Sequence, residues 1–221
     1  MVEIKGIEKS YGKKQVLKGV NLEIDAGSMV GILGENGSGK STLLSILAGL
    51  QHPDCGFFNI DGKDLMQNQA LRNELVAYVP QENPLIAELT AWDNLRMWYP
   101  LDKLKEELSE GFLAMLGIDA FLKVPVNQMS GGMKKRLTIG CAINSDPKIL
   151  LLDEPTAALD LVCKERIYTY FDQFKAQGGT LILATHEVQE IELCDQCYIL
   201  KNGVVDSYRY DGDIPHLIGR L

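Results

Sequence analysis

The sequence predicts an α/β fold in which a mostly parallel sheet is covered by helices. Short, nearly continuous apolar runs at residues 29–33 and 149–152 predict strands that are buried on both faces. Between them, Leu43, Leu44 and Leu47 lie at helical spacing, which predicts a helix over residues 40–50. Strands that alternate with helices in this way are typical of a parallel sheet.

The other expected elements follow in chain order. Val20, Leu22 and Ile24 alternate with polar residues, so the first 27 residues predict an antiparallel sheet with one face in water. A long helical region then interrupts the α/β pattern. We therefore expect one domain over residues 1–221, in which a helical subdomain at 81–145 is inserted into a core formed by 1–80 and 146–221. Further strands are expected at residues 75–79, 148–152 and 180–184, and a further helix at 164–174.

Composition excludes several classes of protein. Of the 221 residues 46% are hydrophobic and 24% charged, as in ordinary globular chains, and 22 basic against 30 acidic residues give a net charge of −8. An acidic chain has no overall attraction to a phosphate backbone, so no nucleic-acid partner is expected. No apolar run reaches the roughly 18–20 residues of a membrane span. Charges at residues 1–5 disfavour a signal peptide, so we expect a cytoplasmic protein.

The five cysteines do not form a pattern typical of a disulfide framework. Cys194 and Cys197 make an isolated CxxC, which is compatible with a redox pair or with half of a zinc site. No second pair completes four ligands, so we favour a packing role for both thiols.

A phosphate-binding loop is predicted at residues 34–41, which read GENGSGKS and fit the pattern GxxxxGK[ST]. A strand before the loop and a helix after it give the context that this motif requires. Backbone N–H groups of such a loop point at phosphate oxygens, its lysine reaches the β- and γ-phosphates and its serine binds Mg²⁺. The alternative is a glycine-rich turn with a chance lysine. The predicted ATP ligands are Gly34, Asn36, Gly37, Ser38, Gly39, Lys40, Ser41 and Thr42.

Two carboxylates follow the buried strand at residues 149–152. Asp153 and Glu154 are expected at the carboxyl edge of the sheet, where ligands of open α/β folds bind. Asp153 would hold Mg²⁺ through water, and Glu154 would deprotonate the water that attacks the γ-phosphate. Alone, the pair could be a surface turn, but beside a phosphate loop it predicts a nucleotide hydrolase.

At this point the sequence resembles the ATP-binding subunit of an ABC transporter over nearly the whole chain. The resemblance implies a P-loop NTPase core, with ATP and Mg²⁺ as cofactors, and gives roles to further residues. Each has a simpler alternative as a surface aromatic, a loop polar residue or a strand-end histidine, but their joint order favours the family. They are Tyr11, which would stack on adenine; Gln81, which would sense Mg²⁺ and water; Ser130-Gly131-Gly132, the signature; Ala158-Leu159-Asp160, the D-loop; and His186, the switch histidine.

The signature also makes physical sense as a second anion site. Ser130, Gly131 and Gly132 precede an apolar-periodic segment, so they are expected to form a helix N-terminus with free N–H groups. In the family, ATP lies between the phosphate loop of one subunit and the signature of the other. The resemblance therefore implies a second ATPase subunit, identical or different, and a separate membrane permease that holds the pair at the inner face of the cell membrane.

The signature departs from the commonest family pattern. Met129 replaces Leu, and Met133 replaces Gln, so a polar contact from position 133 is lost. The form Ser-Gly-Gly-Met-Lys is similar to that of exporter ATPases, which favours export. Two other functions remain open: a soluble ABC-class ATPase acting on a ribosome or chromosome, and a P-loop kinase for a small molecule. The net charge and the compact insertion disfavour the first, and the signature disfavours the second.

Overall fold

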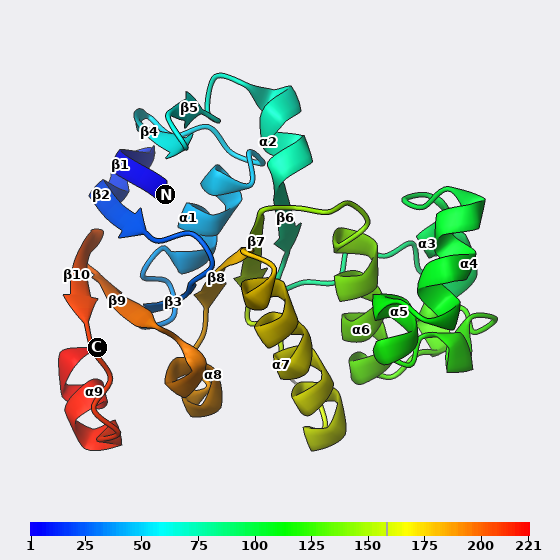
Figure 1. Ribbon diagram of the computed structural model, residues 1–221. Helices are drawn as coiled ribbons and strands as arrows, with labels where there is room; N and C mark the ends of the chain where they lie inside the picture. The colour runs from blue at the N-terminus through cyan, green and yellow to red at the C-terminus, as the bar shows by residue number, and fades with distance from the viewer. Residues whose placement is uncertain (158) are drawn as a thin grey trace.

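The computed structural model describes residues 1–157 and 159–221 and confirms the predicted α/β fold class. Two sheets and a group of helices make up the chain (Figure 1). The first sheet is antiparallel, and in its second strand Val20, Leu22 and Ile24 point into the core, as the alternation predicts. A later segment completes this sheet. Its strand order is β2-β1-β4-β5, formed by β1 (Val2–Tyr11), β2 (Lys14–Ile24), β4 (Cys55–Ile60) and β5 (Lys63–Asp64).

The second sheet is parallel apart from one edge strand. The central strands β3, β7 and β8 are buried along their whole length, which explains why their sequences are continuous apolar runs. Because these strands run in the same direction, their carboxyl ends share one edge of the sheet. The strand order is β10-β9-β3-β8-β7-β6, with β3 (Met29–Leu33), β6 (Val76–Val79), β7 (Ile149–Asp153), β8 (Thr180–Ala184), β9 (Gln196–Lys201) and the antiparallel β10 (Val204–Tyr208).

Some predicted boundaries differ from the structure. The helix expected over residues 40–50 ends at Leu47, and Leu50 is exposed in the turn that follows Gly49. Leu75, expected to begin a strand, ends a helix that is capped by Asn68. The helices outside the insertion are α1 (Lys40–Leu47), α2 (Gln69–Leu75), α7 (Leu161–Ala176), α8 (Val188–Leu193) and α9 (Ile214–Arg220).

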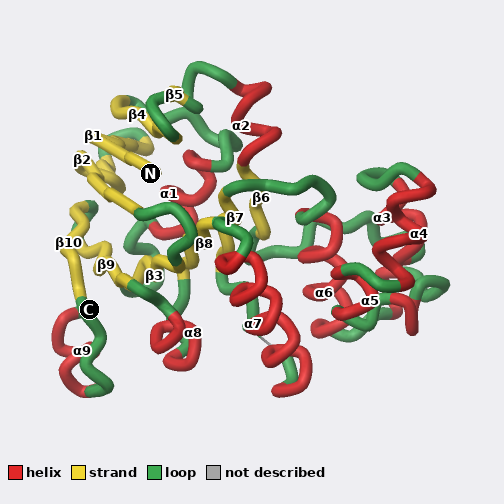
Figure 2. The backbone as a smooth tube through the Cα atoms, in the orientation of Figure 1, coloured by secondary structure: helices red, strands yellow, loops and turns green. Residues whose placement is uncertain are grey.

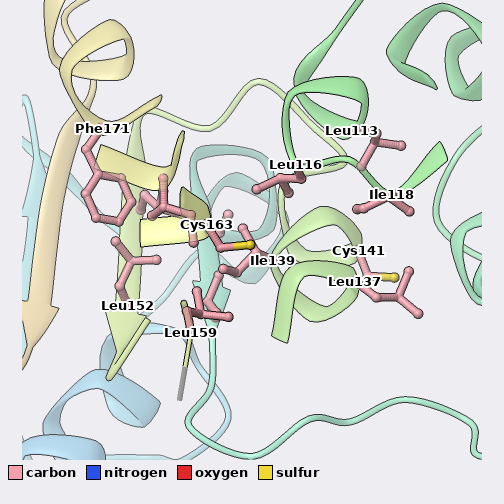
Figure 3. Packing of buried hydrophobic residues seen from close by; sticks show 14 of the residues in the cluster. Leu113, Leu116, Ile118, Leu137, Ile139, Cys141, Leu152, Leu159, Cys163 and Phe171 are labelled. Atoms are coloured by element: carbon pink, nitrogen blue, oxygen red, sulfur yellow. The ribbon is translucent and has the colours of Figure 1, made fainter. Parts of the chain in front are cut away.

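The inserted region is helical, and it lies to one side of the two sheets (Figure 2). Its helices share a hydrophobic core with the parallel sheet. Leu137 and Ile139 of α6 pack in one cluster with Leu113 and Ile118, and the same cluster continues to Leu152 of β7 (Figure 3). The signature helix α6 is thus packed against both the other helices of the insertion and the sheet. The helices of the insertion are α3 (Ala91–Arg96), α4 (Leu101–Ser109), α5 (Phe112–Met115) and α6 (Gly131–Ala142).

None of the helices formed by residues 1–157 and 159–221 combines the length and the apolar character needed to cross a membrane.

Candidate active site

The predicted phosphate loop connects the end of β3 to the start of α1. Its backbone needs glycine at two places in particular. Gly34 has φ 155°, and a Cβ atom there would lie 2.5 Å from the carbonyl oxygen of Leu200. Gly39 has φ 112° and is the N-cap of α1, so the chain enters this helix from a left-handed conformation that other residues rarely adopt. The loop therefore curls tightly in front of the positive end of the helix dipole.

Lys40 lies along this loop. Its side chain is buried, and the Nζ atom donates hydrogen bonds to the carbonyl oxygens of Gly34 at 2.7 Å and Glu35 at 3.1 Å. Burial lowers the pKa of Lys40, while the negative charges of Glu154 and Asp153 raise it. The ammonium group is thus fixed between the loop and two carboxylates, at a place suited to a polyanion.

Asp153 ends β7 directly behind the loop, and only 2% of the residue is exposed. Burial raises the pKa of Asp153, while the Ser41 hydroxyl beside it and the charges of Lys135 and Lys40 lower it. A carboxylate next to a hydroxyl offers the oxygen donors that Mg²⁺ prefers. No group of three or more His, Cys, Asp or Glu side chains in the described part of the chain is arranged to hold a metal by itself. The pair therefore fits an ion whose other ligands are phosphate oxygens and water.

Glu154 is held between residues from two neighbouring strand ends. Its backbone has φ 48°, unusual for a residue other than glycine, and its N–H donates to the carbonyl oxygen of Ala184 at 2.9 Å. Gln81 Nε2 donates to Glu154 Oε2 at 3.0 Å, and His186 Nδ1 lies 3.2 Å from Glu154 Oε1. The structure thus brings together three polar residues that follow β6, β7 and β8.

Lys40, Glu154 and the two partners of Glu154 face one cleft of about 680 Å³ in front of the phosphate loop, whereas the buried Asp153 is not part of its lining. Most of the residues predicted to bind or hydrolyse a nucleotide line it. Ser38 instead lines a neighbouring hollow, and its buried hydroxyl has no hydrogen-bond partner among the described residues. The predicted residues that line the cleft are Gly34, Asn36, Gly37, Gly39, Lys40, Ser41, Thr42, Gln81, Glu154 and His186.

The predicted signature lies elsewhere on the molecule. Ser130 is the N-cap of α6, and its hydroxyl accepts a hydrogen bond from the backbone N–H of Met133 at 3.2 Å. A Cβ atom added to Gly131 would meet no other atom within 4 Å, so this helix start is open. Neither these residues nor Gly132 line the cleft, and α6 is separated from α1 by the sheet strands (Figure 1).

Comparison with known proteins identifies the family. The model of the ABC transporter family matches residues 17–157, which is more than half of the chain. The chain belongs to the ABC transporter family.

Individual relatives support this assignment over almost the whole length. The linearmycin resistance ATP-binding protein LnrL of Bacillus subtilis is 34% identical, and the match covers 99% of this chain and 72% of the relative. A probable sulfate/thiosulfate import ATP-binding protein of Chlorella vulgaris is 36% identical over 91% of this chain and 88% of the relative. The ATP-binding cassette MJ0796, solved as a dimer in a post-hydrolysis state with ADP and Pi, superposes with a TM-score of 0.84 at 31% identity, over 95% of this chain and 100% of that cassette. The chain is an ATP-binding subunit and an ATPase of this family.

In this ABC subunit the predicted adenine-stacking residue lies outside the lining of the cleft. The Tyr11 hydroxyl donates a hydrogen bond to the Gln51 side chain, and the Lys9 ammonium lies 5.7 Å from the centre of the Tyr11 ring. Almost half of Tyr11 is exposed, so its ring is open to a ligand. Stacking on adenine stays a prediction.

The D-loop prediction falls partly outside the described residues, since Ala158 is not described. Asp160 is the N-cap of α7 and accepts a hydrogen bond from the Cys163 N–H at 2.9 Å, and this hydrogen bond lowers the pKa of Asp160. The two residues that follow, Leu161 and Val162, are 76% and 64% exposed. An exposed apolar pair beside the D-loop is suited to contact with a second chain.

The two methionines that depart from the family signature pack into the subunit. Met129 is buried in the core cluster of the helical region, and Met133 packs against the same cluster. They therefore have packing roles beside the open N-terminus of α6. Cys194 and Cys197 also pack. Their Sγ atoms lie next to Gly31 of β3, where an added Cβ atom would be 3.1 and 3.2 Å from them, as expected of small packing residues.

Sequence reasoning missed a buried polar residue behind the site. Glu190 of α8 is fully buried, and its Oε1 accepts a hydrogen bond of 2.6 Å from Thr156, two residues after Glu154. Burial raises the pKa of Glu190, while Thr156 and Thr185 lower it. Thr185 precedes His186, so Glu190 lies between the segment that follows Glu154 and the segment that contains His186. A glutamate on a short helix gives no sequence signal of burial. The one signal in the sequence that could place it near the site is its distance of four residues from His186.

Proposed function

We propose that this subunit closes with a second ATPase subunit around two MgATP and that hydrolysis drives a separate membrane permease. The observation that carries this proposal is the separation of two anion sites in one chain. None of Ser130, Gly131 and Gly132 lines the cleft at the phosphate loop, so these N–H groups are not part of the phosphate site of their own chain. A partner's signature would complete each cleft. The dimeric structures of the related cassette MJ0796 support the same arrangement.

The geometry supports roles in hydrolysis for the main polar groups of the cleft. The Glu154 carboxylate would accept the proton of the attacking water, because it is fixed by Gln81 on one side and His186 on the other. His186 would orient that water and the γ-phosphate from the end of β8. Lys40 and the N–H groups of the loop would stabilise the charge that spreads over the phosphate oxygens in the transition state.

We propose Mg²⁺ as the metal of this site. Ser41 would bind it through its hydroxyl and Gln81 through its amide oxygen, and Asp153 would hold it through water. When bound, the ion would neutralise negative charge on the phosphate oxygens. Gln81 and Glu154, which reach the cleft from the ends of two strands, would place the attacking water.

The surface that would receive the permease lies on the helical region, at residues 83–98. Trp92 packs against the core of this region, whereas Met97 and Trp98 are 54% and 56% exposed. Ile86, in the same segment, is also exposed. This segment begins two residues after Gln81, so movement at the γ-phosphate would be passed directly to the membrane partner.

We propose export as the direction of transport, and the inner face of the cell membrane as the place of action. The form Ser-Gly-Gly-Met-Lys of the signature supports export. Some relatives are named for export and others for import, so their names do not decide the direction. The proposal of export depends on the signature sequence.

Reconstitution with a membrane protein tests the proposal. The chain is added to vesicles that contain a candidate membrane-spanning permease, sought among the neighbouring reading frames, and ATP hydrolysis is measured with and without that protein. We expect Trp98→Ala to lose the stimulation by the permease and to keep the basal rate. Ile218→Ala, which removes another exposed apolar side chain, on α9, should keep both. Isolation of the chain on ribosomes or DNA with no membrane protein would contradict the transport function.

A further inference from the structure

Lys135 is a buried cation that none of the motifs includes. It lies in α6, five residues after Ser130, and only 4% of the residue is exposed. Its Nζ atom donates a hydrogen bond of 3.1 Å to the carbonyl oxygen of Pro80 and a longer one of 3.4 Å to the carbonyl oxygen of Asp153. The ammonium group therefore joins the signature helix to the ends of two strands, β6 and β7.

The partners of this ammonium group are unusual. Burying a lysine is costly unless the charge is compensated, and burial lowers the pKa of Lys135. No carboxylate among the described residues lies within 4.0 Å of Nζ. The charge is instead compensated by two backbone carbonyls and by the more distant fields of Asp153, Glu154 and Glu190. The side chain is thus fixed to the backbone of the active site rather than paired with an acid.

The two carbonyls belong to the residues that precede the proposed catalytic groups. Pro80 comes directly before Gln81, and Asp153 directly before Glu154. The side chains of Gln81 and Glu154 are themselves joined by a hydrogen bond of 3.0 Å. One ammonium group therefore fixes both backbones from which this hydrogen-bonded pair extends.

A second contact from the same helix supports this connection. Thr138 Oγ1, one turn after Lys135, lies 2.9 Å from Asn83 Oδ1, and Asn83 follows Gln81 by two residues. The buried face of α6 thus contacts the segment of Gln81 at two points, while its N-terminus is open at Gly131. A shift of α6 along its axis would move the carbonyl contacts as a unit.

We propose that Lys135 is a positioning residue that couples the signature helix to the Gln81–Glu154 pair of the same chain. When the γ-phosphate bound on the partner subunit engages the N-terminus of α6, Lys135 fixes the ends of β6 and β7 and holds Gln81 and Glu154 for hydrolysis. ATP bound at one site would thus hold the catalytic pair of the opposite site in position. This inference rests on the proposed roles of Gln81 and Glu154.

Two substitutions and one control test the coupling. Lys135→Met keeps an unbranched chain but removes every donor, whereas Lys135→Gln keeps two N–H donors without the charge. Lys105→Met removes an exposed lysine of α4 that makes no ion pair with the described residues. For each protein the turnover number, the affinity for ATP and the Hill coefficient for ATP are measured, together with the melting temperature. Glu154→Gln is measured in parallel.

We expect Lys135→Met to lower the turnover number by about tenfold or more, while its ATP affinity stays within about twofold, since only the catalytic pair is displaced. Its Hill coefficient should fall towards one. Lys135→Gln should retain turnover within about threefold, because both carbonyls keep a donor, and Lys105→Met should match the wild type.

Three outcomes would overturn the coupling. The first is a wild-type turnover number for Lys135→Met. The second is an equal loss of turnover in Lys135→Gln and Lys135→Met. The third is a loss of ATP affinity and melting temperature in proportion to the loss of turnover. Full turnover of Glu154→Gln would instead contradict the proposed active site itself, so the two failures can be told apart.

Discussion

At the scale of single residues, the active site depends on where Glu154 is held. Its positive φ places the carboxylate at the end of β7 rather than along it, and Gln81 and His186 contact one oxygen each. A base that is fixed from two sides loses little orientational freedom when water binds. The contribution of this residue is therefore expected in the rate of hydrolysis and not in the affinity for ATP.

Glu154→Gln tests this expectation. The amide keeps the shape of the side chain but cannot accept the proton, so hydrolysis should fall by about 10² to 10⁴. Binding of ATP in a fluorescence titration should persist. Glu106→Gln, the same change at an exposed position of α4, serves as the control and should leave phosphate release unchanged. Near-normal turnover of Glu154→Gln would remove Glu154 from its role.

Lys40→Ala should have the opposite effect. Lys40 contributes a charge that lies within the phosphate loop, so its loss should weaken ATP binding by about tenfold or more, as expected for a charge-assisted contact. Titration with ATP measures this change, with Lys63→Ala on the exposed strand β5 as the matched control. An unchanged affinity would show that residues 34–41 are not the phosphate cradle.

At the scale of elements, the sequence predicts what local patterns encode. The buried runs of β3, β7 and β8 and the apolar face of α1 are visible in the sequence because burial selects apolar side chains. The end of α1 at Leu47 was not predicted, since Leu50 continues the helical spacing although it is exposed. The strands at residues 55–60 and 63–64 were not predicted. The first three residues of β4 are exposed, so its sequence shows neither an apolar run nor a regular alternation, and β5 is a pair of residues at the edge of the first sheet.

The start of β3 provides a test of stability at this scale. Asp195 Oδ2 accepts hydrogen bonds from the Met29 N–H at 2.7 Å and from Lys175 Nζ at 2.8 Å, which joins the starts of β3 and β9. Burial raises the pKa of Asp195, but the Lys175 and Met29 contacts outweigh it, and the net pKa is lowered. Asp195→Ala should therefore reduce the free energy of unfolding by about 1 kcal/mol at neutral pH, because a half-exposed pair is screened by solvent.

The pH dependence of this difference has a definite sign. A carboxylate whose pKa is lower in the folded state stabilises the fold above its unfolded value of about 3.9, and the stabilisation is lost as the pH falls through the folded value. Urea unfolding of wild type and Asp195→Ala should therefore converge below about pH 4. Asp206→Ala, at an exposed site on β10, should differ from wild type by less than about 0.5 kcal/mol at both pH values. A gap that widens in acid would contradict the assignment.

At the scale of the whole molecule, the two proposed anion sites lie apart: the phosphate loop lines the cleft, and the N-terminus of α6 does not. The sequence predicts both sites from their motifs, but it does not predict the buried contacts behind them. Lys135 and Glu190 are charged residues that periodicity alone would place on a surface, and their burial depends on contacts between α6, α8 and the strand ends. Such tertiary contacts have no local signature in the sequence. The exposed Leu161 and Val162 are consistent with a surface that is covered when two subunits close.

The central claim is that each subunit completes the ATP site of the other. Light scattering of the Glu154→Gln protein during gel filtration tests it most directly. With MgATP we expect twice the single-chain mass of 24.5 kDa, and with no nucleotide the single-chain mass. Gly131→Asp in the same background should bind ATP but stay at the single-chain mass. A wild-type protein that hydrolyses ATP at full rate while Glu154→Gln stays at the single-chain mass at every concentration of protein and MgATP would contradict the account.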